Sequence, residues 1–269
     1  MFGVVPRAIW ERLMPPDADN CIRMACWCVL LEIGGQRVLI ETGMGTDYDA
    51  KEREIYGLTG EWVGSSLEAI GVSPTSIDVV VLTHLHFDHA AGLTRRVAGS
   101  DDYEPVFPNA EVVVQDGEWA SAMTNYSTTK SSYRPEALRV LEGTERLRRV
   151  TKNPPITDGV AVRVTPGHTR YHQSVVVTGP NRTACFVGEL LPTVHHARPS
   201  YQMAYDLDPM ETMRQKAALM EEAEAGNWLL LLDHDSDHPA VTVGRDERGR
   251  HRLEPVADRE QVLGAWITL

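Results

Sequence analysis

Apolar positions in the first part of the chain follow two patterns, short strand-like runs and a longer helical spacing. The runs 25–33 (ACWCVLLEI) and 36–43 (QRVLIETG) flank Gly34-Gly35, and glycine readily adopts the positive φ of a hairpin turn. We therefore expect two paired strands. Over 60–74 (GEWVGSSLEAIGVSP), apolar residues recur at helical intervals before a glycine and a proline, which predicts a helix followed by a loop.

Continuous apolar runs further along indicate strands that are buried on both faces. The segment 76–84 (SIDVVVLTH) is rich in β-branched residues and ends on a histidine. A strand that leads into a helix is predicted over 109–123 (NAEVVVQDGEWASAM), and a surface helix with solvated charges over 132–147 (SYRPEALRVLEGTERL).

The second half of the chain continues the alternation of strands and helices. Alternating valines predict a strand over 159–168, and turn residues at 179–181 predict a hairpin within 173–190. Asp208 and the following proline are typical of a helix start, and we expect this helix to end at Gly226. A last buried strand is predicted over 228–235. Because we find no repeat and no linker, we expect one α/β domain spanning 1–269.

Composition and charge narrow the functional classes. The 269 residues are 42% hydrophobic, which is enough material for a buried core. The 26 basic and 38 acidic residues give a net charge of −12 with no basic stripe, so nucleic acid is a poor candidate partner. We find no signal-peptide pattern and no run of membrane-spanning length. The four cysteines form no CxxC pair, so we expect reduced, mostly buried thiols in a cytoplasmic protein that does not bind membranes.

Potential metal ligands gather at the ends of the predicted strands. The segment 82–92 (LTHLHFDHAAG) holds three histidines and an aspartate within six positions. Two histidines one residue apart project to the same side of an extended chain, whereas the Asp-His pair lies where the chain turns into a helix and can face a second ion. Imidazole and carboxylate ligands are typical of zinc, iron, manganese or cobalt, and a catalytic site leaves one position open for water. The candidate ligands are His84, His86, Asp88, His89, His168, Glu189 and His234.

These motifs resemble the metallo-β-lactamase superfamily. Its HxHxDH signature stands here as HLHFDH at 84–89, and TPGHT (165–169), FVGEL (186–190) and LLDHD (231–235) follow in the family's order. The resemblance implies an α/β fold of the αβ/βα sandwich type, with the site at one edge. It also implies that His84, His86 and His168 hold one metal ion, and that Asp88, His89 and His234 hold a second.

Two glutamates depart from the family pattern. Glu189 stands where the family usually has a bridging aspartate. A glutamate is one methylene longer, so it bridges ions roughly 3.5–4 Å apart only if the backbone retreats or the ions shift. We expect Glu189 to bridge; ligation of a single metal and a weakly filled second site are the alternatives. Glu41 likewise replaces the aspartate that would orient a ligand histidine.

Other polar residues allow more than one interpretation. His172 is either a hydrogen-bond partner of a ligand or a structural histidine. Asp233 and Asp235 either orient His234 or are solvated. Tyr201 and Tyr205 either donate to a developing oxyanion or serve in packing. We expect His195 and His196 on the rim of the site, and His238 and His251 in exposed loops.

The resemblance implies metal-assisted hydrolysis. We expect two divalent ions, zinc first and iron, manganese or cobalt as alternatives, with a metal-bound hydroxide as nucleophile and Asp88 as the catalytic proton carrier. The chain is most similar to the branch with N-acyl-homoserine lactonases and methyl-parathion-type hydrolases, so the expected small-molecule substrate is an ester, lactone or phosphotriester. Pro192 stands where the lactonases have a tyrosine, which argues against lactones. Glyoxalase-II-like thioester hydrolysis and a non-catalytic metal-binding or sensing role are the alternatives, and a homodimer is left open.

Overall fold

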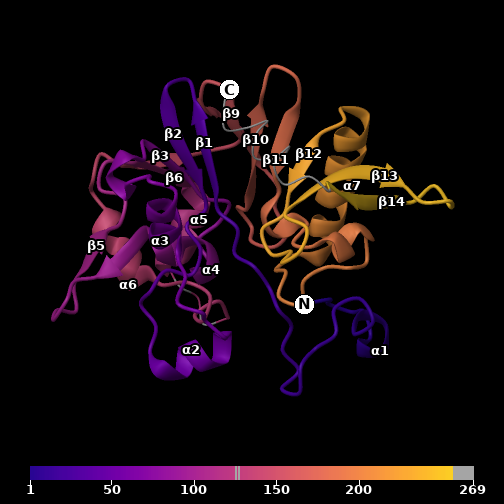
Figure 1. Cartoon of the computed structure of the whole chain (residues 1–269), viewed down its shortest axis with the longest axis horizontal. Helices are drawn as coiled ribbons and strands as arrows, with labels where there is room; N and C mark the ends of the chain where they lie inside the picture. The colour runs from indigo at the N-terminus through magenta and orange to yellow at the C-terminus, as the bar shows by residue number, and fades with distance from the viewer. Residues whose placement is uncertain (125, 127, 257–269) are drawn as a thin grey trace. The chain divides into compact units, whose positions relative to one another are not determined.

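The computed structural model describes residues 1–124, 126 and 128–256, and the chain divides into two compact units (Figure 1). The central unit is Cys28–Thr151. The terminal unit combines Met1–Trp27 with Lys152–Leu269, of which 257–269 lie outside the described residues. Each unit has its own large sheet. The single domain expected over 1–269 stays a prediction.

The central unit is built on a five-stranded sheet. Its strands, in sheet order, are β1 (Val29–Ile33), β2 (Gln36–Ile40), β3 (Val79–Val81), β6 (Glu111–Gln115) and β7 (Leu147–Val150). β1 and β2 form the antiparallel hairpin predicted around Gly34-Gly35, whose φ angles are 59° and 77°. The other neighbours are parallel. All three valines of β3 are buried, as expected for a strand covered on both faces.

Several helices of the central unit bury apolar residues in a core shared with this sheet. The helices are α2 (Ala50–Tyr56), which has no buried residue, α3 (Val63–Ala69), α4 (Phe87–Ala90), α5 (Asp116–Thr124) and α6 (Pro135–Leu138). A small antiparallel sheet of β4 (Thr94–Arg96) and β5 (Tyr103–Pro105) follows α4. Leu67 of α3 and Trp119 of α5 belong to the same buried cluster as Val80 of β3. The helices predicted within 60–74 and 109–123 are therefore present.

The surface helix predicted over 132–147 is wrong. α6 spans a single turn, and a 3₁₀ turn at Arg139–Leu141 follows before Gly143, with φ of 72°, redirects the chain toward β7. Leu138 and Leu141 are buried in the core rather than lying on a solvated helix. Tertiary packing of these two leucines overrides the helical spacing of the sequence.

The terminal unit is built on a seven-stranded sheet (Figure 1). Its strands, in sheet order, are β14 (His251–Pro255), β13 (Ala240–Arg245), β12 (Leu229–Leu231), β11 (Thr183–Phe186), β10 (Gln173–Thr178), β9 (Val160–Val164) and β8 (Pro155–Thr157). Only the β11–β12 pair is parallel. Thr178 pairs with Thr183, so the predicted hairpin turn lies between them.

The long helix α7 (Pro209–Ala225) packs against this sheet and begins where the sequence predicts. The Asp208 side chain accepts a hydrogen bond from the backbone nitrogen of Glu211 at 3.0 Å, Pro209 occupies the first helical position, and Gly226 follows the last turn. Leu219 and Met220 of α7 share a buried cluster with Leu230 of β12. The short helix α1 (Arg7–Trp10) precedes all of these elements in the same unit.

The expected burial of the cysteines is wrong in most cases. Cys21 and Cys26 are exposed and Cys28 is partly buried, so only Cys185 of β11 behaves as a buried thiol. The first three lie before the strands begin, and of these Cys28 packs against the core of the central unit. Within the described ranges, no helix combines the length and the apolar character that crossing a membrane requires.

Candidate metal centre

The histidine segment of the central unit follows directly from β3. The backbone nitrogen of Leu82 still donates to Val113 at 3.1 Å, so the chain stays extended past the end of the strand. It turns at His86, which precedes the first turn of α4. The His84 ring lies 4.5 Å from the His86 ring and 4.1 Å from the His89 ring, centroid to centroid. Ligand atoms of the pairs His84/His86 and Asp88/His89 lie within 4.8 Å of each other, as the spacing of the motif predicts.

Glu41 connects this segment to the end of β2. Its Oε1 accepts a hydrogen bond from the backbone nitrogen of Thr83 at 2.8 Å, and its Oε2 lies 3.4 Å from Nδ1 of His89. The carboxylate is therefore placed to orient a histidine despite replacing an aspartate. Glu41 has φ of 65°, a region that non-glycine residues rarely adopt and that is found preferentially at functional sites.

A second buried carboxylate, Glu118 of α5, was missed by the sequence analysis. Its Oε1 accepts hydrogen bonds from the backbone nitrogen of Leu85, between two histidines of the motif, at 3.2 Å and from the Tyr133 hydroxyl at 2.9 Å. The Tyr133 ring lies 4.9 Å from the His86 ring. Burial, together with the Glu118 charge, raises the pKa of Tyr133, so its hydroxyl remains a donor. Nothing in the sequence distinguishes Glu118 from an exposed helical glutamate.

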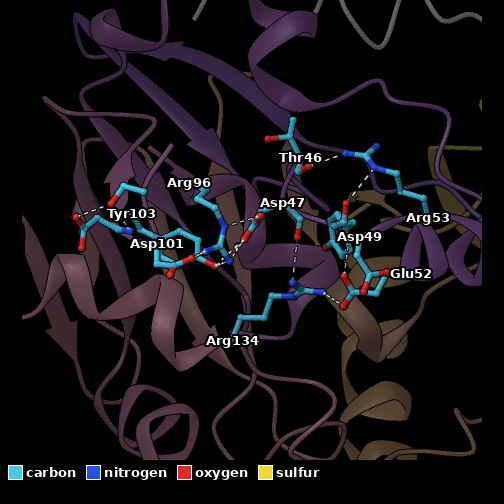
Figure 2. Close-up of polar contacts among 12 residues, drawn as sticks. Thr46, Asp47, Asp49, Glu52, Arg53, Arg96, Asp101, Tyr103 and Arg134 are labelled. Atoms are coloured by element: carbon cyan, nitrogen blue, oxygen red, sulfur yellow. Dashed lines mark hydrogen bonds and ion pairs between the residues drawn. The ribbon is translucent and has the colours of Figure 1, made fainter. Parts of the chain in front are cut away.

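A polar network joins Asp47, before α2, to Arg96, Tyr103 and Arg134 (Figure 2). The Arg134 guanidinium lies 4.4 Å from the Tyr48 ring and 6.0 Å from the Phe87 ring, and it donates to the Asp47 carbonyl at 3.1 Å and to Glu52 at 2.8 Å. The Asp47 side chain accepts in turn from Arg96 Nε at 3.1 Å and from the Tyr103 hydroxyl at 2.6 Å. This network ties α2 and β4–β5 to the residue in the middle of the histidine motif.

In the terminal unit, Glu189 contacts two of the predicted ligands at once. It lies in a 3₁₀ turn, Gly188–Leu190, just after β11. Its Oε2 lies 2.8 Å from Nδ1 of His168, and its Oε1 lies 2.9 Å from Nε2 of His234. All three side chains are buried. Nδ1 of His234 donates to the Ala25 carbonyl at 2.7 Å, which leaves Nε2 directed at the carboxylate.

The charges around these two histidines suit a cation. Burial alone would lower the pKa of His168, but Glu189 and Asp206 outweigh it and raise that pKa to about 10. Burial alone would also lower the pKa of His234, but the contacts with Asp233, Cys26 and Glu189 outweigh burial and raise that pKa. The buried carboxylates thus stabilise positive charge at both imidazoles, and a divalent ion can replace the protons. The donor set of buried imidazoles and carboxylates fits a zinc-like metal.

Asp206 is a further contact that the sequence analysis missed. Its Oδ1 lies 3.0 Å from Nδ1 of His168. The ring centroid of the neighbouring Tyr205 lies 5.8 Å from that of His168 and Tyr205 is 49% exposed, so it is open to solvent beside a predicted ligand. Tyr201 is instead buried against Phe2, which favours its packing role.

The remaining histidines have structural contacts. His172 is buried and its Nδ1 lies 2.9 Å from the Thr165 hydroxyl, which favours a structural role. His196 was expected on a rim, but it is fully buried and its ring stacks on Phe2 at 4.6 Å; burial lowers its pKa to about 3. His195 is partly buried and His238 is exposed.

His251 was expected in an exposed loop, but it lies in β14 with its Nε2 3.2 Å from Glu224. A ligand atom of Glu221 is also within 4.8 Å, and this trio resembles a metal site. Arg245 donates to Glu221 at 3.0 Å and to Glu224 at 2.6 Å, so both carboxylates already have a cationic partner and we interpret the group as an ion-pair network.

Asp235 connects the turn that follows β12 to the 3₁₀ turn Val194–Ala197. Its carboxylate accepts from the backbone nitrogens of Val194, at 2.9 Å, and His238, at 2.7 Å. Asp235 therefore has a structural role and is not a solvated carboxylate. Asp233 is buried, and its Oδ2 lies 3.7 Å from Nε2 of His234.

Comparison with known proteins supports the family resemblance. Residues 22–102 match the model of the Metallo-beta-lactamase superfamily. An N-acyl homoserine lactonase of Bacillus cereus is 25% identical over 170 residues, which cover 59% of this chain and 60% of that protein. The chain therefore spans less than two thirds of the length of this curated relative.

Solved structures share the fold. A probable metal-dependent hydrolase from Staphylococcus aureus is 27% identical with a TM-score of 0.85, covering 96% of this chain and 91% of that chain. The dizinc quorum-quenching lactonase AidC is 19% identical with a TM-score of 0.73, covering 90% and 82%. The predicted resemblance and the metallo-β-lactamase fold are thereby confirmed.

Proposed function

We propose that this chain, which carries a metallo-β-lactamase superfamily domain on the fold of that superfamily, is a metal-dependent hydrolase. The observation that carries the proposal is the position of Glu189, with one carboxylate oxygen at 2.8 Å from His168 and the other at 2.9 Å from His234. A buried carboxylate that reaches two predicted ligand histidines with different oxygens is near enough to both to serve as the bridging ligand of a two-metal site.

The ligand assignment in this proposal follows the family resemblance. We assign one ion to His84, His86 and His168, and the other to Asp88, His89 and His234. Glu189 would bind both ions. Two divalent ions in such a site supply Lewis acidity and a nucleophile near neutral pH. The dizinc lactonase neighbour supports zinc as the first metal to test.

Asp88 is the residue we assign to proton transfer. Its side chain is 23% exposed, whereas the other side chains of the ligand set are almost fully buried. Its Oδ2 lies 3.6 Å from Nε2 of His89. A carboxylate that keeps contact with solvent can accept a proton at Oδ and return it to the leaving group.

The proposed substrate is a small ester, lactone or phosphotriester. Relatives named N-acyl homoserine lactonase support a lactone substrate. Pro192 stands in place of the lactonase tyrosine, so esters and phosphotriesters should be tested as well. The net charge of −12 favours neutral substrates over anionic ones, because a strongly acidic protein repels anions.

The test compares the parent with His86→Ala and, as control, His238→Ala, which removes an exposed histidine outside the ligand set. Metal per chain is measured by elemental analysis, and kcat/KM with N-hexanoyl-homoserine lactone, 4-nitrophenyl acetate and a phosphotriester. We expect His86→Ala to lose one ion and at least about 100-fold in kcat/KM, since even outer contacts of metal ligands are worth 10–100-fold. The control should match the parent. Unchanged stoichiometry and rate in His86→Ala would contradict the assignment, and metal binding without turnover of any substrate would favour the non-catalytic role.

A further inference from the structure

Two carboxylates approach the same nitrogen of His168. Glu189 Oε2 lies 2.8 Å and Asp206 Oδ1 lies 3.0 Å from Nδ1. A neutral imidazole that carries its proton on Nδ1 has a single N–H to donate there. The contact with Asp206 has hydrogen-bond geometry, so Asp206 accounts for this N–H and the Glu189 carboxylate is available for other contacts.

Asp206 is held in this position independently of Glu189. The backbone nitrogen of Leu207 donates to the His168 carbonyl at 3.1 Å, and that of Asp208 donates to the Gly167 carbonyl at 2.8 Å. Gly167 has φ of 142°, and a Cβ atom there would come within 2.3 Å of the Thr212 hydroxyl, so the two segments are in close contact. The Asp206 side chain is 0% exposed. Its carboxylate thus stays against His168 whichever way Glu189 turns.

Glu189 also contacts a second predicted ligand, His234. Its second oxygen already contacts His234, and the proposed function requires both oxygens for metal ions. Asp206 contacts only one predicted ligand. When Nδ1 keeps its proton on Asp206, Nε2 is the one ring nitrogen with a lone pair to offer a metal. A carboxylate behind a ligand histidine commonly has this effect, because it fixes the tautomer and the ring orientation.

We propose that Asp206 is a positioning residue, which accepts the Nδ1 proton of His168, fixes this histidine as an Nε2 ligand and frees Glu189 for metal binding. This inference rests on the proposed function, since it concerns the same metal site. Asp206 acts through His168 and does not itself touch the metals or the substrate.

The test compares Asp206→Asn and Asp206→Ala with the matched control Asp208→Asn. The control makes the same carboxylate-to-amide change two residues away, where asparagine caps α7 as well as aspartate does. Zinc affinity is measured by competition with a chromophoric chelator, and the absorption spectrum of the cobalt-loaded protein reports ligand geometry. We expect Asp206→Asn to weaken the binding of at least one zinc ion about 10-fold, and Asp206→Ala to weaken it up to about 100-fold. Both variants should have an altered cobalt spectrum. Asp208→Asn should keep both affinities and the parent spectrum.

A measurement on the parent protein tests the inference even if the variants do not fold. Long-range ¹H–¹⁵N NMR spectra of the zinc-loaded parent should show His168 with its proton on Nδ1. Protonated Nε2 in this spectrum overturns the inference, as does a zinc affinity of Asp206→Asn equal to that of Asp208→Asn. If the parent binds no metal at all, the proposed function fails first, so the two failures are distinguishable.

Discussion

Glu189 shows how one methylene group changes the reach of a ligand. It follows Gly188, whose φ is 57°, in a tight 3₁₀ turn at the end of β11. From this turn the longer side chain contacts His168 and His234 with different oxygens. The retreat of the backbone that a glutamate needs is therefore compatible with the observed turn, and a bridging role stays our prediction.

The charge and the length of Glu189 can be tested separately. Glu189→Gln keeps the length but replaces a charged ligand with a neutral amide, so we expect at least about 10-fold weaker binding of one or both ions. Glu189→Asp restores the length usual in the family and should have the milder effect. Metal per chain after dialysis against a defined zinc concentration measures both. Two ions retained by Glu189→Gln at parental affinity would refute the bridging role.

The candidate ligands were predictable from the sequence because each one directly follows a recognisable strand. The histidine motif follows β3, His168 follows β9, and Glu189 and His234 follow β11 and β12. Glu118 and Asp206 were not predictable. They reach Leu85 and His168 from elements that are distant in sequence, so no local pattern marks them. Their roles depend on tertiary contacts that a single sequence does not display.

Arg96 of β4 pairs with two aspartates, of which Asp47 is partly buried and Asp101 is exposed. Asp47, before α2, is partly buried between Arg96 of β4 and Tyr103 of β5 (Figure 2). Burial alone would raise the pKa of Asp47, but hydrogen bonds from Arg96 and Tyr103 outweigh it and hold that pKa below its usual value of 3.8. Burial, reinforced by Asp47, raises the pKa of Tyr103 to about 12.

This contact predicts a pH-dependent stability. Because the folded pKa of Asp47 is depressed, its contribution is fully present above pH 3.8 and is lost as the pH falls through the folded value. We expect Asp47→Asn to lower the free energy of unfolding by about 0.5–1 kcal/mol at pH 7 and to differ less from the parent at pH 3. Urea unfolding at both pH values measures this difference.

Asp101→Asn is the matched control for Asp47→Asn. Asp101 also pairs with Arg96, at 2.8 Å, but its side chain is fully exposed, so its removal should change little. A loss in Asp47→Asn of the same size at pH 7 and pH 3 would show that packing, rather than the charge of Asp47, holds these elements together.

Elements with a strong local signal were predicted well, and the stretch whose spacing conflicts with core packing was not. The glycine hairpin of β1–β2, the buried valines of β3 and the capped helix α7 all appear where the sequence places them. The stretch 132–147 has a helical spacing, yet it forms one turn of helix because Leu138 and Leu141 are needed in the core. Local propensity decides such short segments only when tertiary packing does not oppose it.

At the scale of the molecule, carboxylates at and beside the proposed ligands are buried. Glu41, Glu189 and Asp233 are almost completely buried, and each lies within ion-pair distance of a histidine. Buried carboxylates are costly unless they are paired with cations. Without metal, the chain compensates by raising the pKa values of His168 and His234, as found. Metal ions that bind the folded chain should therefore stabilise it as a whole.

Metal removal is the test of this coupling between binding and folding. A ligand that binds only the folded state at 100 times its Kd adds about 2.7 kcal/mol to the free energy of unfolding. We expect zinc-loaded protein to unfold at higher urea concentration than protein stripped with a chelator and dialysed free of it, by an amount of this order for each ion. Zinc should restore the loss, whereas magnesium should not, because magnesium prefers oxygen ligands and the proposed set is mostly imidazole. His84→Ala should reduce the gain on zinc addition, since it removes one proposed ligand. Equal unfolding midpoints for stripped and zinc-loaded parent protein would mean that zinc does not bind preferentially to the folded chain, and the proposed metal site would have to be abandoned.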